Sequence, residues 1–222
     1  MNRPSIPYIS STIPLSESIE PFLDQLVVHD FRGDIDLDLA RRLVGATDNS
    51  VYQLLPQAIL YPRIIKDIEL VMHLLAQEEF RVLNITPRGG GTGTNGQSLT
   101  TGISLDLSRY LNQIIEINLK EKWVEVEAGV VLDQLNDALK SSGYFFAPNL
   151  SPSSRATIGG MINTDAAGKG SRVYGKTSDH IIALDLICIG GETERIEPIQ
   201  ADVIREGLED KGHFTQRIMS PL

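Results

Sequence analysis

Apolar positions in the first part of the chain recur at intervals of three and four residues. This spacing predicts a helix between residues 16 and 29 and further helices over 37–44 and 67–80. Two short apolar runs, 58–61 and 81–86, predict strands that alternate with these helices. The alternation favours a small α/β lobe with some parallel pairing.

After a glycine-rich stretch the hydrophobic pattern changes. Residues 103–107 alternate as in a strand, and the alternating runs 114–117 and 123–127 predict a hairpin. Helical spacing returns over 131–141, and 181–189 is a nearly all-apolar strand that a glycine pair turns back into a partner strand. The second half is therefore expected to contain a mixed or antiparallel sheet with flanking helices. The predicted fold class is α+β, with two lobes.

Composition and charge exclude several classes of function. A formal net charge of -9 argues against nucleic-acid binding, although local backbone amides can still bind a small anion. Cys188 is the only cysteine, so no internal disulfide can form and a reducing compartment is expected. The four histidines show no metal-ligand spacing.

No targeting or membrane segment is predicted. No apolar stretch reaches the roughly 20 residues that span a bilayer, and residues 1–14 lack the apolar core of a signal peptide. The expected location is cytoplasmic, with attachment of a longer protein to a membrane surface left open.

Two nucleotide-binding strings occur in the sequence, and their contexts argue against both. Gly91–Gly96 fits G-x-G-x-x-G, but a short Ser/Thr-rich stretch and a strand follow where a dinucleotide fold requires a helix. Gly170–Thr177 fits the phosphate-loop string G-x-x-x-x-G-K-[ST]. Its upstream residues are loop-like and a strand follows it, so NTPase chemistry is not expected.

The loop 87–97 has a different chemical possibility when it is considered whole. Its three successive glycines can adopt conformations forbidden to other residues, and their N–H groups can converge into a concave anion site. Arg88 could contribute charge or brace the loop. A flexible surface loop would tolerate the same glycine run, and this alternative stays open. A second segment, 148–168, is long and rich in small residues, which is typical of a functional loop.

Several motifs together resemble a known family. They are Arg88-Gly-Gly-Gly-Thr-Gly93, Glu127-Ala-Gly-Val130, Thr157-Ile-Gly-Gly160, Tyr174-Gly175 and the strand that opens at Ile181. In this order they resemble the FAD-binding domain shared by vanillyl-alcohol oxidase and p-cresol methylhydroxylase. The similarity covers about 49–196 and is strongest to FAD-linked D-2-hydroxyacid dehydrogenases (D-lactate, glycolate and D-2-hydroxyglutarate enzymes), in the large bacterial type with a C-terminal iron–sulfur domain.

The resemblance implies a two-lobed PCMH-type domain with FAD extended between the lobes. The loop from Arg88 would hold the pyrophosphate, and the segment from Pro148 would follow the ribityl chain and the isoalloxazine. Residues 163–165 would lie near the ring or the pyrophosphate, and Gly175 and Ile181 near the adenosine. The implied FAD-binding residues are Arg88, Gly89, Gly90, Gly91, Thr92, Gly93, Thr94, Asn95, Pro148, Ser153, Ser154, Thr157, Gly159, Gly160, Asn163, Thr164, Asp165, Gly175 and Ile181.

Departures from the family pattern refine this expectation. Members that attach FAD covalently through the first loop carry His where this chain has Thr92, so non-covalent FAD is expected. Many relatives have Asn at the position of Asp165, and an acid there would alter the environment of the ring. The turn 149–151 replaces a more usual Asp-containing turn.

The implied reaction is hydride transfer from C2 of a 2-hydroxy acid to FAD, giving the 2-oxo acid. By resemblance, the groups that bind and deprotonate the substrate come from a cap domain downstream, with an iron–sulfur domain or another electron acceptor beyond it. No catalytic residue is therefore assigned, and His180 is expected to make a structural hydrogen bond. The expected division is a helical extension at 1–48, the FAD-binding domain at 49–197 (lobes 49–97 and 98–197) and a tail at 198–222.

Three other functions compete with this one. A non-catalytic FAD-binding or regulatory module is the main alternative, and a reading frame that continues into a cap domain would distinguish the two. A cell-wall enolpyruvyl reductase shares the fold but usually has Gly-x-Gly-Ser-Asn in its glycine loop. An adaptor whose glycine loops are merely flexible would not bind FAD.

Overall fold

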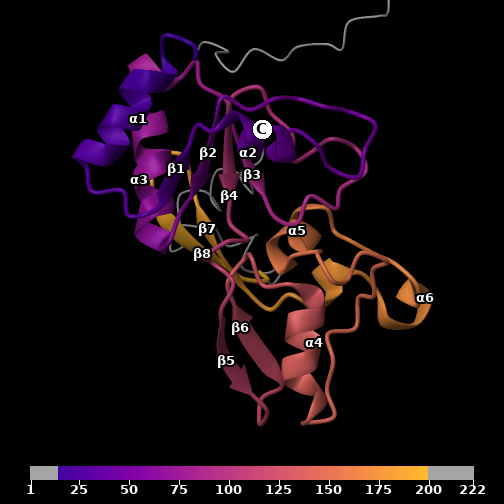
Figure 1. Cartoon of the computed structure of the whole chain (residues 1–222). Coiled ribbons are helices and arrows are strands. Elements are labelled where there is room, and N and C mark those ends of the chain that lie inside the picture. Colours follow the sequence, from indigo (N-terminus) through magenta and orange to yellow (C-terminus); the bar gives the residue numbers. More distant parts are fainter. Residues whose placement is uncertain (1–14, 200–222) are drawn as a thin grey trace, which may run out of the picture.

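A computed structural model describes residues 15–199 of the chain (Figure 1). Its first lobe contains a four-stranded sheet in the order β1-β2-β4-β3. The strands are β1 (Asp34–Asp36), β2 (Ala58–Tyr61), β3 (Ile85–Arg88) and β4 (Ile103–Asp106). Strands β2 and β3 each pair with β4 in parallel, whereas β1 pairs with β2 in the antiparallel direction. The expected small α/β lobe with parallel pairing is confirmed.

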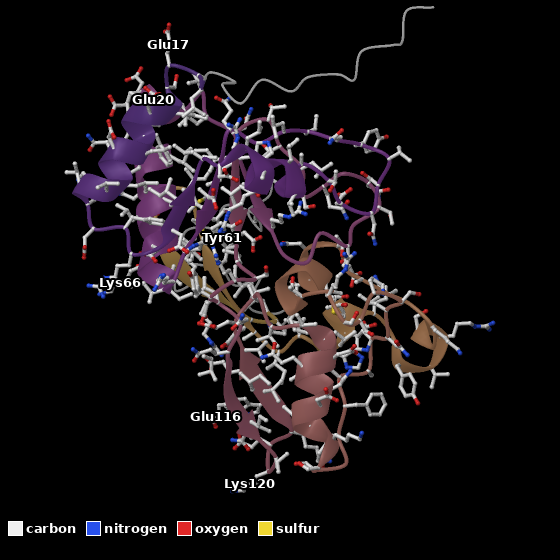
Figure 2. The ribbon with its side chains drawn as sticks, viewed as in Figure 1. Glu17, Glu20, Tyr61, Lys66, Glu116 and Lys120 are labelled. Carbon is white, nitrogen blue, oxygen red and sulfur yellow. The ribbon has the colours of Figure 1, made fainter. Side chains whose placement is uncertain are left out.

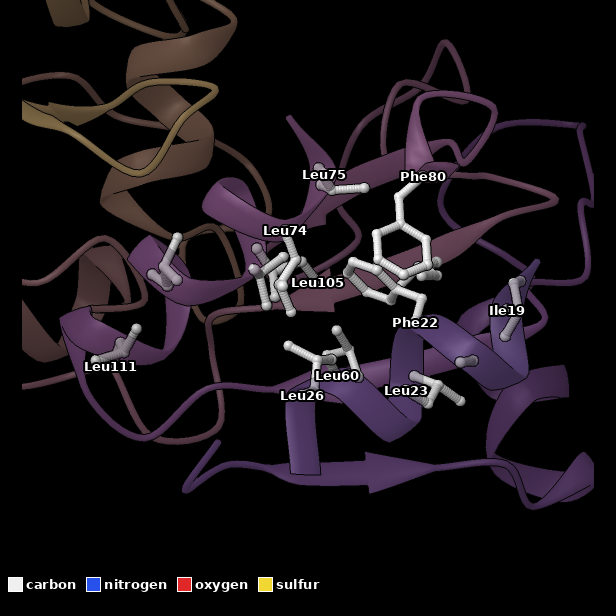
Figure 3. Close-up of a cluster of buried hydrophobic side chains, with 14 residues drawn as sticks. Ile19, Phe22, Leu23, Leu26, Leu60, Leu74, Leu75, Phe80, Leu105 and Leu111 are labelled. Atoms are coloured by element: carbon white, nitrogen blue, oxygen red, sulfur yellow. The ribbon is translucent and has the colours of Figure 1, made fainter. Parts of the chain in front are cut away.

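The core of this lobe lies between the sheet and two helices, α1 (Ile19–Val28) and α3 (Ile65–Leu75), which run side by side in Figure 1. Phe22 of α1 packs edge-on against Phe80, with ring centroids 5.2 Å apart (Figure 3). Phe80 ends the short 3-10 helix η1 (Glu78–Phe80). The interior of β2 is buried because a central parallel strand is covered on both faces, which explains its uninterrupted apolar sequence.

Helix α2 and the start of α3 fix the chain around this sheet. Helix α2 (Leu39–Gly45) is capped by Asp38, whose carboxylate accepts a hydrogen bond from the Arg41 N–H. The buried carboxylate of Asp67 accepts from the N–H groups of Arg32, Arg63 and Ile64. These hydrogen bonds tie the turn before β1 to the first turn of α3.

The second lobe is built on a smaller core. The antiparallel hairpin of β5 (Ile114–Asn118) and β6 (Trp123–Val126) packs against α4 (Leu132–Lys140), as Figure 1 shows. Helix α5 (Ile158–Asn163) adds Met161 to the same cluster. The short helix α6 (Ser171–Tyr174) and the 3-10 helix η2 (Thr177–His180) follow.

The last described hairpin returns to the first lobe. Strands β7 (Leu184–Ile187) and β8 (Thr193–Ile196) pair with each other and with no other strand of residues 15–199. The Gly190 N–H donates to the Met72 carbonyl of α3 at 3.1 Å, and the Thr193 hydroxyl donates to Glu69 at 2.8 Å. The two-lobed α+β fold class is confirmed, but the strands of the second half form two separate hairpins.

Several charged side chains project from the outside of both lobes. In Figure 2, Glu17 and Glu20 project from the start of α1, and Glu116 and Lys120 project from the β5–β6 hairpin. None of the helices within 15–199 is long and apolar enough to cross a membrane. The same residues contain no group of three or more His, Cys, Asp or Glu suited to holding a metal ion.

Several local predictions differ from the structure. The predicted helix 67–80 is divided into α3, which ends at Leu75, and η1. The strand predicted over 181–189 is limited to β7, so it opens at Leu184 and not at Ile181. Strand β3 begins at Ile85 rather than at 81, because η1 and the turn after it occupy the first part of the predicted strand. Consequently Pro87 and Arg88 belong to a strand and not to the glycine loop. The segment 148–168 is not a continuous loop, because α5 begins within it.

The predicted division of the chain stays a prediction, but packing crosses two of its boundaries. Helix α1 belongs to the extension 1–48, yet it supplies Phe22 to the core of the first lobe. Strand β4 lies beyond the predicted boundary at 97 and pairs inside the first sheet. The predicted tail 198–222 lies almost wholly outside the described residues.

Candidate functional site

The glycine loop leaves the carboxyl end of β3 with a run of unpaired backbone donors. From Gly89 to Thr94, none of the backbone N–H groups donates to an acceptor within residues 15–199. The hydroxyls of Thr92 and Thr94 are likewise without a partner in that range, and the side chain of Thr94 is exposed. Unpaired N–H groups that succeed one another on a glycine-rich backbone are suited to binding an anion.

Arg88 fixes the base of this loop. Its guanidinium donates to the carbonyls of Gly45 at 3.2 Å and Thr47 at 2.7 Å, so it ties β3 to the end of α2. Gly91 has a φ of 61°, and a Cβ there would lie 2.6 Å from an Arg88 nitrogen. The backbone conformation therefore favours glycine at this position, and a larger residue would also displace the Arg88 guanidinium.

A carboxylate lies on the strand next to Arg88. Asp106 of β4 is the register partner of Arg88 and accepts hydrogen bonds from the N–H and hydroxyl of Ser108. Burial raises the pKa of the Asp106 carboxyl, and the Ser108 hydrogen bonds and the Arg88 charge act in the opposite direction. Arg88 therefore has both structural carbonyl partners and a nearby acid.

The second small-residue segment packs directly on the glycine loop. A Cβ added at Gly89 would meet the Thr157 hydroxyl, and one added at Gly90 would meet the Arg155 carbonyl. The side chain of Thr157 is buried and accepts a hydrogen bond from the Gly160 N–H at 3.4 Å, which caps α5. The two loops that the sequence singles out thus share one boundary between the lobes.

Backbone hydrogen bonds hold the second segment in this position. The Leu132 N–H donates to the Ala156 carbonyl at 2.9 Å, and the Ile158 N–H donates to the Val130 carbonyl at 2.8 Å. The Gly159 N–H donates to the Ala128 carbonyl at 2.8 Å. A Cβ added at Gly159 would lie only 2.7 Å from the Ala128 Cβ, so a larger residue does not fit there. Residues 128–132, which overlap the motif 127–130, therefore support the segment 156–159.

The end of α5 is pinned by hydrogen bonds of its own. The Thr164 hydroxyl donates to the Gly160 carbonyl at 3.0 Å. The Asp165 carboxylate pairs with the Lys176 ammonium and accepts from the Ser178 N–H at 3.0 Å. These hydrogen bonds, that from Lys176 foremost, lower the pKa of Asp165 to about 2. The carboxylate of Asp165 therefore connects α5 to η2.

The remaining predicted residues lie further along the same lobe. Ser153 lines a cavity of ≈ 270 Å³ together with Asn149, Lys169 and residues of α4. Gly175 has a φ of 80° between α6 and η2, and Ile181 follows η2. His180 bonds the Tyr174 carbonyl through Nε2 at 2.7 Å, which agrees with its expected structural role.

Two residues at the junction were absent from the sequence-based set. Asn49 donates its N–H to the Gly93 carbonyl at 3.1 Å and its side-chain amide to the Thr92 carbonyl at 3.5 Å. Its side-chain oxygen accepts from Arg155 at 3.1 Å. Arg155 lies inside the segment 148–168, and its position between predicted site residues could have indicated a role in the site. Asn49 lies far before the glycine loop in the sequence, and nothing in the sequence indicated its role.

Comparisons with known proteins agree with this geometry. The family described as FAD binding domain matches residues 56–197. The chain is 52% identical over 198 residues to D-2-hydroxyglutarate dehydrogenase of Escherichia coli (strain K12), covering 89% of the chain and 19% of that protein. It is 31% identical over 175 residues to glycolate oxidase subunit GlcD of Bacillus subtilis (strain 168), covering 78% of the chain and 36% of that protein. The chain thus spans about a fifth of the length of its D-2-hydroxyglutarate dehydrogenase relatives.

Solved structures show the same fold. A crystal structure of p-cresol methylhydroxylase with substrate bound matches with a TM-score of 0.68 and 16% identity, over 82% of this chain and 36% of that one. The resemblance to PCMH-type FAD-binding domains is therefore confirmed. This chain belongs to the FAD-binding domain family, and its cofactor is FAD.

Proposed function

We propose that this chain is the FAD-binding part of a dehydrogenase that oxidises a 2-hydroxy acid to the 2-oxo acid. Its relatives carry the names D-2-hydroxyglutarate dehydrogenase, glycolate oxidase subunit and D-lactate dehydrogenase. The substrate is accordingly a 2-hydroxy acid of the D-2-hydroxyglutarate, glycolate or D-lactate type. The chemistry that bound FAD supplies is acceptance of a hydride from the carbon that bears the hydroxyl.

The observation that carries the proposal is the unpaired N–H run from Gly89 to Thr94 beside the second segment. A diphosphate presents several oxygen acceptors that such donors can satisfy together. No Cβ can be accommodated at Gly89 or Gly90, so the two segments touch only because these residues are glycines. A flexible loop would not require this contact, and the packing favours the anion site.

The remaining assignments follow the course of an extended cofactor. In this proposal, residues 88–95 surround the diphosphate, although Arg88 serves as a brace rather than as a ligand. The segment from Pro148 through Gly160 accompanies the ribityl chain and the ring, with Asn163 and Thr164 beside it. Gly175 and Ile181 lie toward the adenosine. The carboxylate of Asp165 acts by holding α5 against η2, since Lys176 and Ser178 already engage it.

FAD binding is proposed to be non-covalent, because Thr92 cannot form the bond that a histidine forms with the flavin. No residue of this chain is proposed to be catalytic. A cap domain in a longer protein would bind the substrate carboxylate and remove the hydroxyl proton. An iron–sulfur domain or another acceptor would receive the electrons. A cytoplasmic location is proposed from the single cysteine.

A binding experiment tests the loop assignment. Purified chain is titrated with FAD, and flavin fluorescence and co-elution in gel filtration are measured. Thr94→Asp places a carboxylate on an exposed part of the loop and should weaken binding strongly by repelling the diphosphate. The matched control is Thr101→Asp, which makes the same replacement at another exposed threonine. Thr101 precedes β4, at the end of the parallel β3–β4 pair opposite to the one from which the glycine loop leaves.

Two results would contradict the proposal. Equal FAD affinity in Thr94→Asp and Thr101→Asp would contradict the assignment of the diphosphate to the glycine loop. The substrate assignment is tested on a longer protein that contains this chain. If that protein oxidised none of D-2-hydroxyglutarate, glycolate and D-lactate, the 2-hydroxy acid assignment would be contradicted, whereas the FAD site would not.

A further inference from the structure

The positive charge beside the glycine loop is arranged asymmetrically. Two arginines flank the loop, but their hydrogen bonds differ. The Arg88 guanidinium donates to two backbone carbonyls and lies near Asp106. The Arg155 guanidinium has a single protein partner within residues 15–199, the neutral side-chain oxygen of Asn49, and no ion pair with a carboxylate there. Its charge is therefore not compensated locally.

The side chain of Arg155 follows the glycine loop. At one end, its Cβ lies 3.4 Å from the position that a Cβ on Gly90 would occupy. At the other end, its Nη2 lies 3.1 Å from Asn49 Oδ1. Since Asn49 also bonds the carbonyls of Thr92 and Gly93, the guanidinium is held at the end of the unpaired N–H run.

Asn49 therefore has two functions in this arrangement. By accepting a hydrogen bond from Arg155, it restricts a long and otherwise exposed side chain to the loop. By donating to Thr92 and Gly93, it turns the carbonyls of these residues toward itself. In a trans peptide, the C=O and the N–H that follows it point in opposite directions. Because the carbonyls of Thr92 and Gly93 point toward Asn49, the N–H groups that follow them point away from it and are available to an anion.

We propose that the Arg155 guanidinium supplies the positive charge that binds the diphosphate of FAD, and that Asn49 is the positioning residue that holds it there. A guanidinium presents planar, charged donors that match phosphate oxygens, and it remains protonated at any working pH. Arg155 keeps all its donors except the one on Asn49 free of protein acceptors within 15–199. The inference rests on the proposed FAD site and names the residue that neutralises its ligand.

The test compares FAD with riboflavin, which has the same ring but no phosphate. Arg155→Gln should weaken FAD binding roughly 10- to 100-fold, the loss of one or two charge-assisted hydrogen bonds. Riboflavin binding should stay the same. The salt dependence of FAD affinity between about 0.05 and 0.5 M should also become shallower in this variant. Arg172→Gln on α6 is the control, since it removes an equal charge from another exposed arginine.

Two further variants test the charge of Arg155 and its positioning by Asn49. Arg155→Lys keeps the stem and the charge, so it should bind FAD more tightly than Arg155→Gln and keep most of the salt dependence. Asn49→Ala should weaken FAD binding less than Arg155→Gln does, with a shallower salt dependence than the wild-type chain. Circular dichroism and thermal unfolding establish that each variant is folded.

The possible failures are distinguishable. Unchanged FAD affinity and salt dependence in Arg155→Gln would overturn the role of Arg155 and leave the FAD site standing. An equal loss in Arg155→Lys and Arg155→Gln would show that the positive charge is not what binds FAD, and would overturn the proposal, since both variants keep the backbone and Cβ that pack on Gly90. Absence of FAD binding by the wild-type chain would overturn both the proposed function and this inference.

Discussion

The contact between Gly90 and Arg155 gives a sharp test of how the two cofactor segments depend on each other. In Gly90→Ala, the added methyl would overlap the Arg155 carbonyl oxygen and lie 2.7 Å from its carbon. Both are backbone atoms, so no side-chain rotation relieves the overlap, and either the loop or the segment around Arg155 must move. Overpacking of this kind costs about 1–3 kcal/mol.

The matched substitution is Gly160→Ala in α5. A Cβ there has one neighbour, the Thr157 hydroxyl at 3.2 Å, and the residue is exposed within a helix. Alanine in a helix is favoured over glycine by about 0.8–1.0 kcal/mol, so the change should be neutral or stabilising. The same glycine-to-alanine replacement is therefore expected to lower the free energy of unfolding at Gly90 and to leave it unchanged or raise it at Gly160. Both positions border the segment from Arg155 to Thr157.

Thermal and urea unfolding of the two variants measure this difference. For a chain of this length, each kcal/mol shifts the midpoint by roughly 2–4 °C, so Gly90→Ala should unfold several degrees below Gly160→Ala. Gly90→Ala should also bind FAD at least about tenfold more weakly than the wild-type chain, because displacement of the segment moves Arg155 away from the glycine loop. Equal unfolding midpoints of the two variants, together with wild-type FAD affinity in Gly90→Ala, would refute the packing of the two segments.

Three further predictions concern the same region. Thr157→Val should lose about 1 kcal/mol of stability in urea unfolding, because it removes the hydroxyl that caps α5. Thr157→Ser keeps the hydroxyl and should retain most of this stability, and equal losses in the two variants would refute the cap. Because the folded pKa of Asp165 is about 2 and its unfolded value 3.8, its stabilising effect should be complete above pH 3.8 and be lost as the pH falls through 2. The unfolding midpoints of the wild type and Asp165→Ala should therefore converge as the pH falls from 3.8 to 2, and a constant difference would exclude the pairing with Lys176. Finally, D-lactate added anaerobically to this chain loaded with FAD should leave the flavin absorbance unchanged, and rapid bleaching would show that the catalytic groups lie within it.

The local hydrophobic pattern was sufficient to predict the elements that bury a regular set of apolar side chains. The run 58–61 coincides with β2 because a buried parallel strand must be apolar throughout. The helix α4 was found because Leu132, Leu135 and Leu139 face one core. In both cases burial repeats with the period of the element, so sequence and structure carry the same signal.

Prediction failed where non-local contacts decide the conformation. Strand β3 includes Pro87 and Arg88, which resemble loop residues, because the adjacent β4 supplies partners for the whole run. Helix α5 contains Gly159 and Gly160, which lower helix propensity, yet the Thr157 cap and the packing of Ile158 and Met161 stabilise it. Sequence spacing could not reveal that β7 and β8 return to α3.

The site shows the same division between local and non-local information. The glycine run and the segment containing Thr157 were recognisable because their composition is unusual, but their contact depends on the support of 156–159 by 128–132. Arg155 and Asn49 were missed because an arginine and an asparagine are common in surface loops. Their hydrogen bond spans 106 residues of sequence, and only the folded chain brings them together.

The overall charge of the chain makes this local arrangement necessary. A net charge of -9 repels an anionic cofactor at long range, although salt at physiological concentration screens that repulsion beyond about 8 Å. Attraction must therefore arise within the loop itself, from N–H dipoles and from a guanidinium that no carboxylate within residues 15–199 neutralises. Arg88 cannot fill this role, because it braces α2 and lies beside Asp106. If Arg155 carries the attraction, its loss should reduce FAD affinity most at low salt, where the repulsion by the remaining acidic surface is strongest.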